Sequence, residues 1–229
     1  MSDLLKRFVS RETVSVKVCG LRDLESAEML IEEGVDALGV NFWERSKRYL
    51  SLDEAKQWLP KVEGRILRVG LFVNHSMDFV ERVWEAGILD VVQLHGDESL
   101  ASFQYLRQRG IPVWRAAGVK DASSLEGLKA DLTEADAWLL DAHAPGVFGG
   151  TGQTLDWDLA GAFVSENTGV SWILAGGLKP ENVREAIEAV RPSAVDLASG
   201  VESAPAVKER PLVKALMNEV RGDTSVESR

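Results

Sequence analysis

The stretch TVSVKVCGLRDLESAEMLIEEGVDALGVNF, residues 13–42, contains a complete strand–helix–strand unit. Alternating valines over Val14–Val18 predict the first strand, and Ala37–Phe42 predicts the second. Between them lies a segment whose apolar residues recur every three or four positions, which is typical of an amphipathic helix. Asp23 stands at its expected N-cap and Gly34 stands where it should stop. The stretch therefore predicts a β–α–β unit.

The same alternation continues along the chain. Ser51 and Ser76 stand at further N-cap positions, Gly87 and Gly110 stand where helices should end, and Pro180 suits a first helical turn. The remaining predicted strands are Ile66–Val73, Val91–Leu94, Val113–Ala117, Ala137–Leu140, Trp172–Leu174 and Ala194–Leu197.

Eight such units in 229 residues match a single (β/α)8 TIM barrel, and we expect residues 1–229 to form that one domain. The alternative is a doubly wound open sheet. That fold normally has fewer strands and favours a GxGxxG turn after the first one, whereas this chain has CGLRDL there. Residues 1–13 are expected to be an N-terminal extension with one amphipathic helical turn, and residues 222–229 a loose polar tail.

The composition narrows the function. A net charge of −10 argues against binding to nucleic acid or to an anionic membrane surface. A single cysteine allows no intramolecular disulfide, and no apolar run has the length of a signal peptide or a membrane span. We therefore expect a cytoplasmic protein that is a monomer or a homodimer and binds a small molecule.

Three ionisable side chains follow predicted strands at the end of the barrel where active sites form. Cys19 follows the first strand, His95 the fourth and Asp141 the sixth. Each also has an ordinary structural interpretation. A free cysteine packs as a small hydrophobe, an aspartate at a strand end often caps a turn, and a histidine there can simply be hydrogen-bonded. Position alone leaves both interpretations open.

Two loops and one basic segment predict how an anionic ligand is held. Gly176 and Gly177 follow the seventh strand, and Ser199 and Gly200 follow the eighth, where barrels often bind phosphate through backbone N–H groups. Arg48, in the segment NFWERSKRYLS, could bind a ligand carboxylate with its planar guanidinium. The long glycine-rich loop after Asp141 is expected to be a functional lid.

Cofactor motifs are missing. The sequence has no HExxH, CxxC or P-loop motif, and we expect neither a metal nor a cofactor.

Eight segments in order resemble phosphoribosylanthranilate isomerase, a cofactor-free barrel enzyme of tryptophan biosynthesis. They are VKVCG, SKRY, RVGLFVN, VQLHG, LLDA, GGTGQTLDW, AGGLKPENV and VDLASGVES. The resemblance implies an intramolecular oxidoreductase that converts a phosphorylated N-ribosyl anthranilate into an open-chain ketose by an Amadori rearrangement.

The resemblance also implies roles for individual residues. Cys19 would be the general base, Asp141 the general acid and Arg48 the partner of the anthranilate carboxylate, with His95 in the substrate site. The phosphate would lie against Gly176–Gly177 and Ser199–Gly200. The chain departs from the family at Trp43, Glu44, Ala142, His143, Ala175 and Ala198.

Other barrels remain as alternatives. A histidine-pathway sugar-phosphate isomerase uses an aspartate where this chain has Cys19. Indole-glycerol-phosphate synthase needs lysines and glutamates at strand ends that we cannot place here. A non-catalytic barrel that binds a phosphorylated metabolite or a partner protein would have no need of both Cys19 and Asp141.

Overall fold

Eight parallel strands close into a barrel in the computed structural model, which describes residues 2–10, 13–142 and 155–222. Strand β1 pairs with both β2 and β8, so the sheet has no edge and the open doubly wound alternative is wrong. The strands of the barrel are β1 (Ser15–Cys19), β2 (Ala37–Asn41), β3 (Leu67–Phe72), β4 (Val91–Leu94), β5 (Val113–Val119), β6 (Ala137–Ala142), β7 (Trp172–Leu174) and β8 (Ala194–Leu197).

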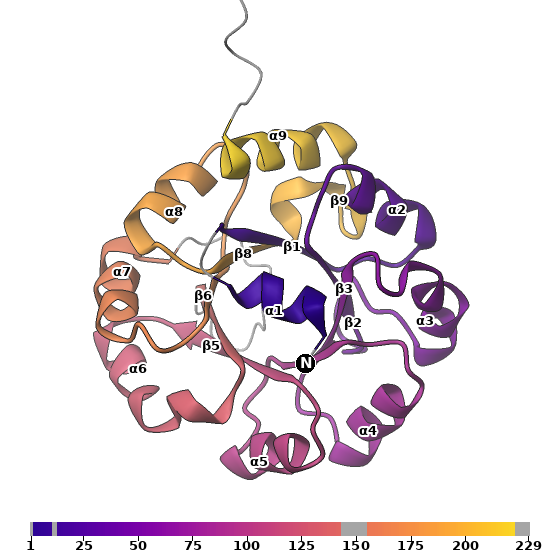
Figure 1. Cartoon of the computed structure of the whole chain (residues 1–229), viewed down its shortest axis with the longest axis horizontal. Helices are drawn as coiled ribbons and strands as arrows, with labels where there is room; N and C mark the ends of the chain where they lie inside the picture. The colour runs from indigo at the N-terminus through magenta and orange to yellow at the C-terminus, as the bar shows by residue number, and fades with distance from the viewer. Residues whose placement is uncertain (1, 11–12, 143–154, 223–229) are drawn as a thin grey trace, which may run out of the picture.

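One helix follows each strand and covers the outside of the barrel (Figure 1). These helices are α2 (Leu24–Glu32), α3 (Leu52–Trp58), α4 (Met77–Glu85), α5 (Leu100–Gln108), α6 (Ala122–Glu126), α7 (Trp157–Glu166), α8 (Val183–Val190) and α9 (Arg210–Arg221). Between these elements lie three 3-10 turns, η1 (Leu59–Val62), η2 (Lys129–Glu134) and η3 (Ser199–Val201), and a small hairpin of β9 (Glu202–Ala204) with β10 (Val207–Lys208).

The capping residues begin and end helices as the sequence predicts. Asp23, Ser51 and Ser76 are the N-caps of α2, α3 and α4, and each side chain accepts a backbone N–H three residues later. Gly34, Gly87 and Gly110 have positive φ and follow α2, α4 and α5. Pro180 is different: it lies in a turn before α8, which has Asn182 as its N-cap, so the prediction of a first-turn proline is wrong.

Two strands are longer than predicted, and this changes the place of an expected catalytic residue. Strand β6 continues two residues beyond Leu140, and Asp141 pairs in register with Gly118 of the extended β5. The ladder holds Asp141 because the parallel neighbour supplies its hydrogen bonds. Strand β1 likewise includes Cys19 as its last residue. Both side chains therefore project from strand backbone rather than from loops.

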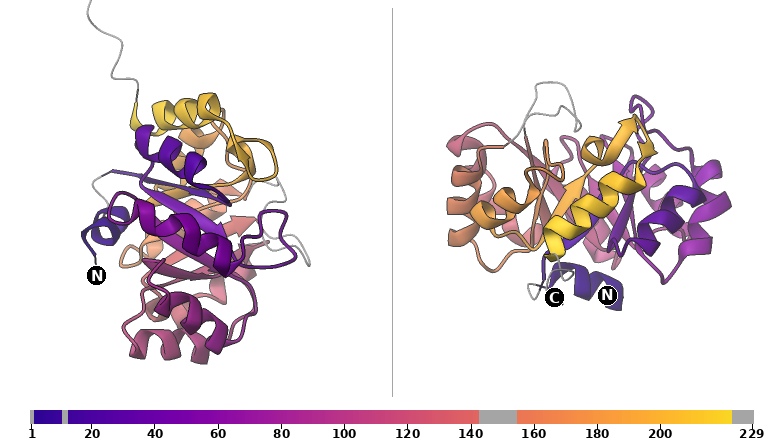
Figure 2. Two further views of the ribbon diagram at one scale, coloured as in Figure 1. Left: turned by 90° about the vertical axis from the view of Figure 1, so that its right-hand side faces the viewer. Right: turned by 90° about the horizontal axis from the view of Figure 1, so that it is seen from above.

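The N-terminal extension forms a helix, α1 (Asp3–Val9), that covers the N-terminal end of the barrel (Figures 1 and 2). Leu5 and Phe8 are buried, and the Phe8 ring stacks on Trp114 with centroids 5.0 Å apart. Inward-facing residues of the strands complete this cluster. The C-terminal ends of the strands, at the other end of the barrel, are left for the site.

Some predictions fall on parts that the structure does not describe. They concern the glycine-rich loop within residues 143–154, including His143, and the tail from residue 223 onward. That the chain forms one domain to its end therefore stays a prediction. None of the helices in the described ranges has the length and apolar character needed to cross a bilayer.

Candidate active site

A cavity of about 670 Å³ opens at the C-terminal ends of the strands. This volume lies within the usual range for small-molecule sites. Residues from strands or loops far apart in the sequence line it because the closed sheet brings all eight strand ends to one rim. Seven of the eight predicted site residues line this cavity: Cys19, Arg48, His95, Asp141, Gly176, Gly177 and Ser199.

Gly200 does not line the cavity. A Cβ placed there would lie 2.0 Å from the carbonyl oxygen of Leu178, so the glycine allows the loop after β8 to pack against the loop after β7. Gly176 and Gly177 both have positive φ, and their backbone N–H groups donate to no described residue. No described residue therefore competes with a ligand oxygen for these two groups.

Cys19 lies in a strongly charged part of the cavity wall. Lys17 is two residues earlier on β1, so its side chain projects from the same face of the strand as the thiol. Burial raises the pKa of the Cys19 thiol, and the nearby Lys17 and Lys208 ammonium groups oppose this rise. Because burial is the largest of these effects, the pKa of the thiol lies above its ordinary value, and the neutral thiol is favoured over the thiolate.

Asp141 contacts His95, and both side chains line the cavity. His95 Nε2 lies 3.3 Å from Asp141 Oδ2, and His95 Nδ1 is 2.9 Å from the amide nitrogen of Gln93. With that amide as donor, the proton of a neutral imidazole resides on Nε2, facing Asp141. A Cβ at Gly176 would come 2.8 Å from Asp141 Oδ1, so the glycine keeps space free beside this oxygen.

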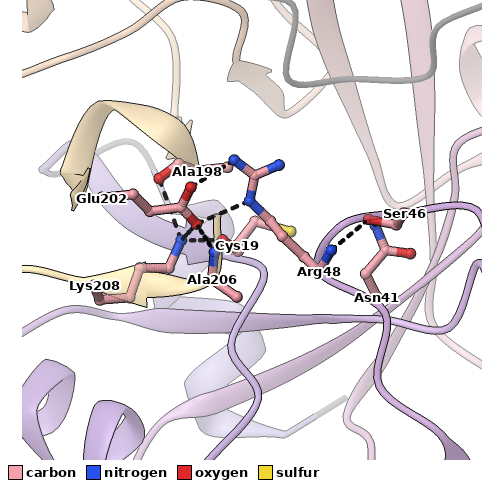
Figure 3. A network of polar contacts seen from close by, with 8 residues as sticks. All are labelled: Cys19, Asn41, Ser46, Arg48, Ala198, Glu202, Ala206 and Lys208. Carbon is pink, nitrogen blue, oxygen red and sulfur yellow. Dashed lines mark hydrogen bonds and ion pairs between the residues drawn. The ribbon is translucent and has the colours of Figure 1, made fainter. Parts of the chain in front are cut away.

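Arg48 is held by a partner that sequence reasoning missed. Its Nε and Nη2 donate to the two carboxylate oxygens of Glu202, at 2.8 and 2.6 Å (Figure 3). Lys208 donates to the same carboxylate at 2.6 Å and to the Cys19 carbonyl at 2.6 Å. Burial raises the pKa of Glu202, but the hydrogen bond from Arg48 and the charge of Lys208 outweigh this, and the pKa lies below its usual value.

This pairing orients the guanidinium. Because Glu202 occupies the Nε–Nη2 edge, the Nη1–Nη2 edge remains as the one that can bind a ligand carboxylate in two-pronged fashion. Gly20 makes room for the arrangement: its φ is +90°, and a Cβ there would lie 2.2 Å from Arg48 Cδ. At the end of β1, Cys19 thus provides the thiol, and Gly20 beside it makes room for the Arg48 side chain.

The loop that carries Arg48 is fixed by Asn41 and Ser46. Asn41, the last residue of β2, donates to Ser46 Oγ at 3.0 Å, and that hydroxyl oxygen accepts the Arg48 backbone N–H at 3.1 Å.

Among the described residues, no group of three or more histidine, cysteine or carboxylate side chains could hold a metal ion.

Some signals for the missed residues were present in the sequence. Lys17 is a lysine inside a run of strand-forming valines, and Asp196 interrupts the apolar run of β8. An ionisable residue at an inward position of a barrel strand is buried, and a buried charge needs a partner. Glu202 and Lys208 carry no comparable signal, because they lie in a polar hairpin.

The fold and the cavity define a (β/α)8-barrel enzyme whose ionisable side chains gather at the C-terminal rim, where barrel active sites lie. The family model for N-(5'phosphoribosyl)anthranilate (PRA) isomerase matches residues 16–219. The chain belongs to this family.

Individual relatives agree. The N-(5'-phosphoribosyl)anthranilate isomerase of Citrifermentans bemidjiense is 41% identical over 206 residues, which cover 90% of this chain and 96% of that one. A crystal structure of the Thermotoga maritima enzyme, which is described as dimeric, is 36% identical with a TM-score of 0.84 and covers 92% of this chain and 100% of its own.

A further crystal structure shows a phosphoribosyl anthranilate isomerase in complex with reduced 1-(o-carboxyphenylamino)-1-deoxyribulose 5-phosphate. Its TM-score is 0.81 at 34% identity, and the alignment covers 92% of this chain and all of that one. The α1 helix of this chain precedes the segment that the family model matches.

Proposed function

We propose that this chain performs the Amadori rearrangement of N-(5-phosphoribosyl)anthranilate to 1-(2-carboxyphenylamino)-1-deoxyribulose 5-phosphate, with Cys19 as general base and Asp141 as general acid. Family membership supports the reaction, which is an aldose–ketose isomerisation in tryptophan biosynthesis. The observation that carries the two roles is that Cys19 and Asp141, which are 122 residues apart, line one cavity together with Arg48.

The reaction begins at the furanose ring. Protonated Asp141 gives its proton to the ring oxygen, the C1–O bond breaks, and the anthranilate nitrogen supplies the electron pair that forms a Schiff base at C1. The space beside Oδ1 that Gly176 leaves open supports this approach. The Cys19 thiolate then removes the C2 proton, and the C–H electron pair forms the C1–C2 double bond of an enolamine. Tautomerisation gives the ketone.

Two further groups hold the ends of the substrate. The Nη1–Nη2 edge of Arg48 binds the anthranilate carboxylate, and the loops at Gly176–Gly177 and Ser199–Gly200 bind the phosphate. The N–H groups of Gly176 and Gly177, which donate to no described residue, support the phosphate position. In a chain of net charge −10, such local donors are needed because the overall field repels an anion.

We propose in addition that the protein works in the cytoplasm as a monomer or a homodimer, on this small-molecule substrate and without nucleic acid. The charge balance and the single cysteine support this setting.

Turnover can be followed by stopped-flow fluorescence, because the anthranilate-linked substrate is fluorescent. Cys19→Ala and Asp141→Ala should each lower kcat at least about 100-fold, the low end for acid–base groups. Cys19→Ser should be nearly as slow as alanine, since a hydroxyl is much less acidic than a thiol. Asp158→Ala, on an exposed aspartate of α7, is the matched control. A folded Cys19→Ala protein that turns over at the wild-type rate would make the thiol a packing residue.

A further inference from the structure

A buried ion pair involves Lys17, which lies two residues before Cys19 on β1. The Lys17 side chain has no exposed surface, and its Nζ donates to Asp196 Oδ2 at 2.6 Å. The pair joins neighbouring strands, since Lys17 of β1 is in register with Asp196 of β8. Because Lys17 and Cys19 are two residues apart on β1, both side chains project from the same face of the strand. The ammonium group that pairs with Asp196 is therefore also a neighbouring charge of the thiol, and it favours the thiolate form.

The pair is poorly built for a purely structural role. In the pair of the buried Arg68 with the partly buried Asp90, both carboxylate oxygens accept hydrogen bonds from the guanidinium, each at 3.0 Å. Asp196, by contrast, has one buried oxygen, Oδ1, with no hydrogen-bond partner among the described residues. An ion pair taken out of water adds stability only where its geometry satisfies both groups. The incomplete pairing indicates that Lys17 and Asp196 are placed for another purpose.

The two charges act on the thiol in opposite directions. An adjacent cation favours the thiolate, and an adjacent anion favours the thiol. Burial itself raises the pKa of Cys19, and Asp196 adds to this while Lys17 opposes it. Among the described residues, the charges that act on Cys19 are Lys17 on β1, Asp196 on β8, Lys208 on β10 and Arg48 after β2. Glu202, which pairs with Lys208 and Arg48, lines the same cavity, as do His95 and Asp141.

We propose that Lys17 is a positioning residue that stabilises the Cys19 thiolate. Asp196 weakens this stabilisation, because its carboxylate competes for the same ammonium group. This inference rests on the proposed role of Cys19 as general base. An ammonium has three N–H donors, so Lys17 keeps its contact with Asp196 while a second donor meets the sulfur. When Cys19 accepts the C2 proton and becomes neutral, Asp196 remains as the counter-ion of Lys17.

The test uses the single cysteine of the chain. Every carbon–sulfur adduct formed with iodoacetamide, as the thiolate displaces iodide, reports on Cys19 alone. The cavity gives this small reagent access. Alkylation rates are measured by mass spectrometry across the pH range for the wild type, Lys17→Met and Asp196→Asn. Circular dichroism checks the fold of each variant.

The two variants should move the alkylation profile in opposite directions. Lys17→Met should slow alkylation at least about tenfold near neutral pH, equivalent to one pH unit in the profile. Asp196→Asn keeps the shape and an acceptor for Lys17 but removes the negative charge, so it should speed alkylation several-fold and shift the profile to lower pH. The rising limb of kcat/KM against pH should shift with the alkylation profile in each case.

Arg68→Lys, which disturbs the ion pair of a buried arginine outside the cavity lining, is the control and should leave the profile in place. The proposal is overturned if the alkylation profile stays in place in both test variants or moves in the same direction in both. A purely structural ion pair would give that result, because removing either partner would disturb the structure in the same way. If Lys17→Met does not fold, the test rests on Asp196→Asn alone: a shift of its alkylation profile to lower pH supports the proposal, and no shift or a shift to higher pH overturns it. If the two variants shift the profile in opposite directions but Cys19→Ala keeps full activity, only the role of Cys19 as general base is contradicted.

Discussion

Replacing Arg48 with alanine is expected to raise the KM for the anthranilate-linked substrate about 10- to 150-fold. This range follows from the contacts of the Arg48 guanidinium. Glu202 already fixes the guanidinium, so little ordering is required when the substrate binds. The free Nη1–Nη2 edge can give charge-assisted hydrogen bonds with a net value of about 1.5–3 kcal/mol. At 1.4 kcal/mol for each factor of ten, this gives the stated range.

Two companion variants separate binding from architecture. Arg48→Lys should recover only part of the loss, because an ammonium lacks the planar fork. Glu202→Gln should have a smaller effect than Arg48→Ala, because the guanidinium keeps its charge and loses only its ionic anchor. Lys208 also binds Glu202, so the carboxylate left behind in Arg48→Ala retains a cationic partner.

The assay is steady-state fluorescence loss at several substrate concentrations, with circular dichroism on each variant. Arg65→Ala is the matched control, since it also removes one arginine from an ion pair but lies outside the cavity lining. An unchanged KM in folded Arg48→Ala protein would refute the reasoning and leave Arg48 as a structural partner of Glu202. A loss confined to kcat would also contradict the binding role.

Three further predictions follow from the structure. Phe8→Ala should lower the free energy of unfolding, measured by urea unfolding, by about 3 kcal/mol, near the low end for such a change because a terminal helix can relax. The kcat should hardly change, because Phe8 stacks on Trp114 at the other end of the barrel. Inorganic phosphate should inhibit competitively by binding at Gly176–Gly177, and a failure to compete even at high concentration would contradict that position. The lowered pKa of Glu202 adds stability that is present above the ordinary glutamate value and lost as the pH falls through the folded value. Thermal melts of wild type and Glu202→Gln should therefore converge in acid, and a gap that persists there would contradict this assignment.

Much of the barrel could be predicted because its signals are local. Val91–Leu94, Trp172–Leu174 and Ala194–Leu197 are strands with the predicted bounds. The N-caps Asp23, Ser51 and Ser76 satisfy backbone N–H groups three residues away, so a short window of sequence carries all the needed information.

Strand ends were less predictable. The ladder extends β6 past Leu140 to include Asp141 because β5 lies beside it, and a strand's neighbour is decided by the closed sheet rather than by its own residues.

The sequence by itself determined the alternation of strands and helices, the end of the barrel at which Cys19, His95 and Asp141 stand, and the family resemblance of eight ordered segments. Only the tertiary structure decided which charges meet. Lys17 contacts Asp196 across 179 positions, and Arg48 contacts Glu202 across 154. Periodicity and capping act within a few residues, whereas these pairs exist because barrel closure places β8 beside β1 and brings the loops of one rim together. The protonation chemistry of Cys19 depends on those long-range contacts, since burial and neighbouring charge set it.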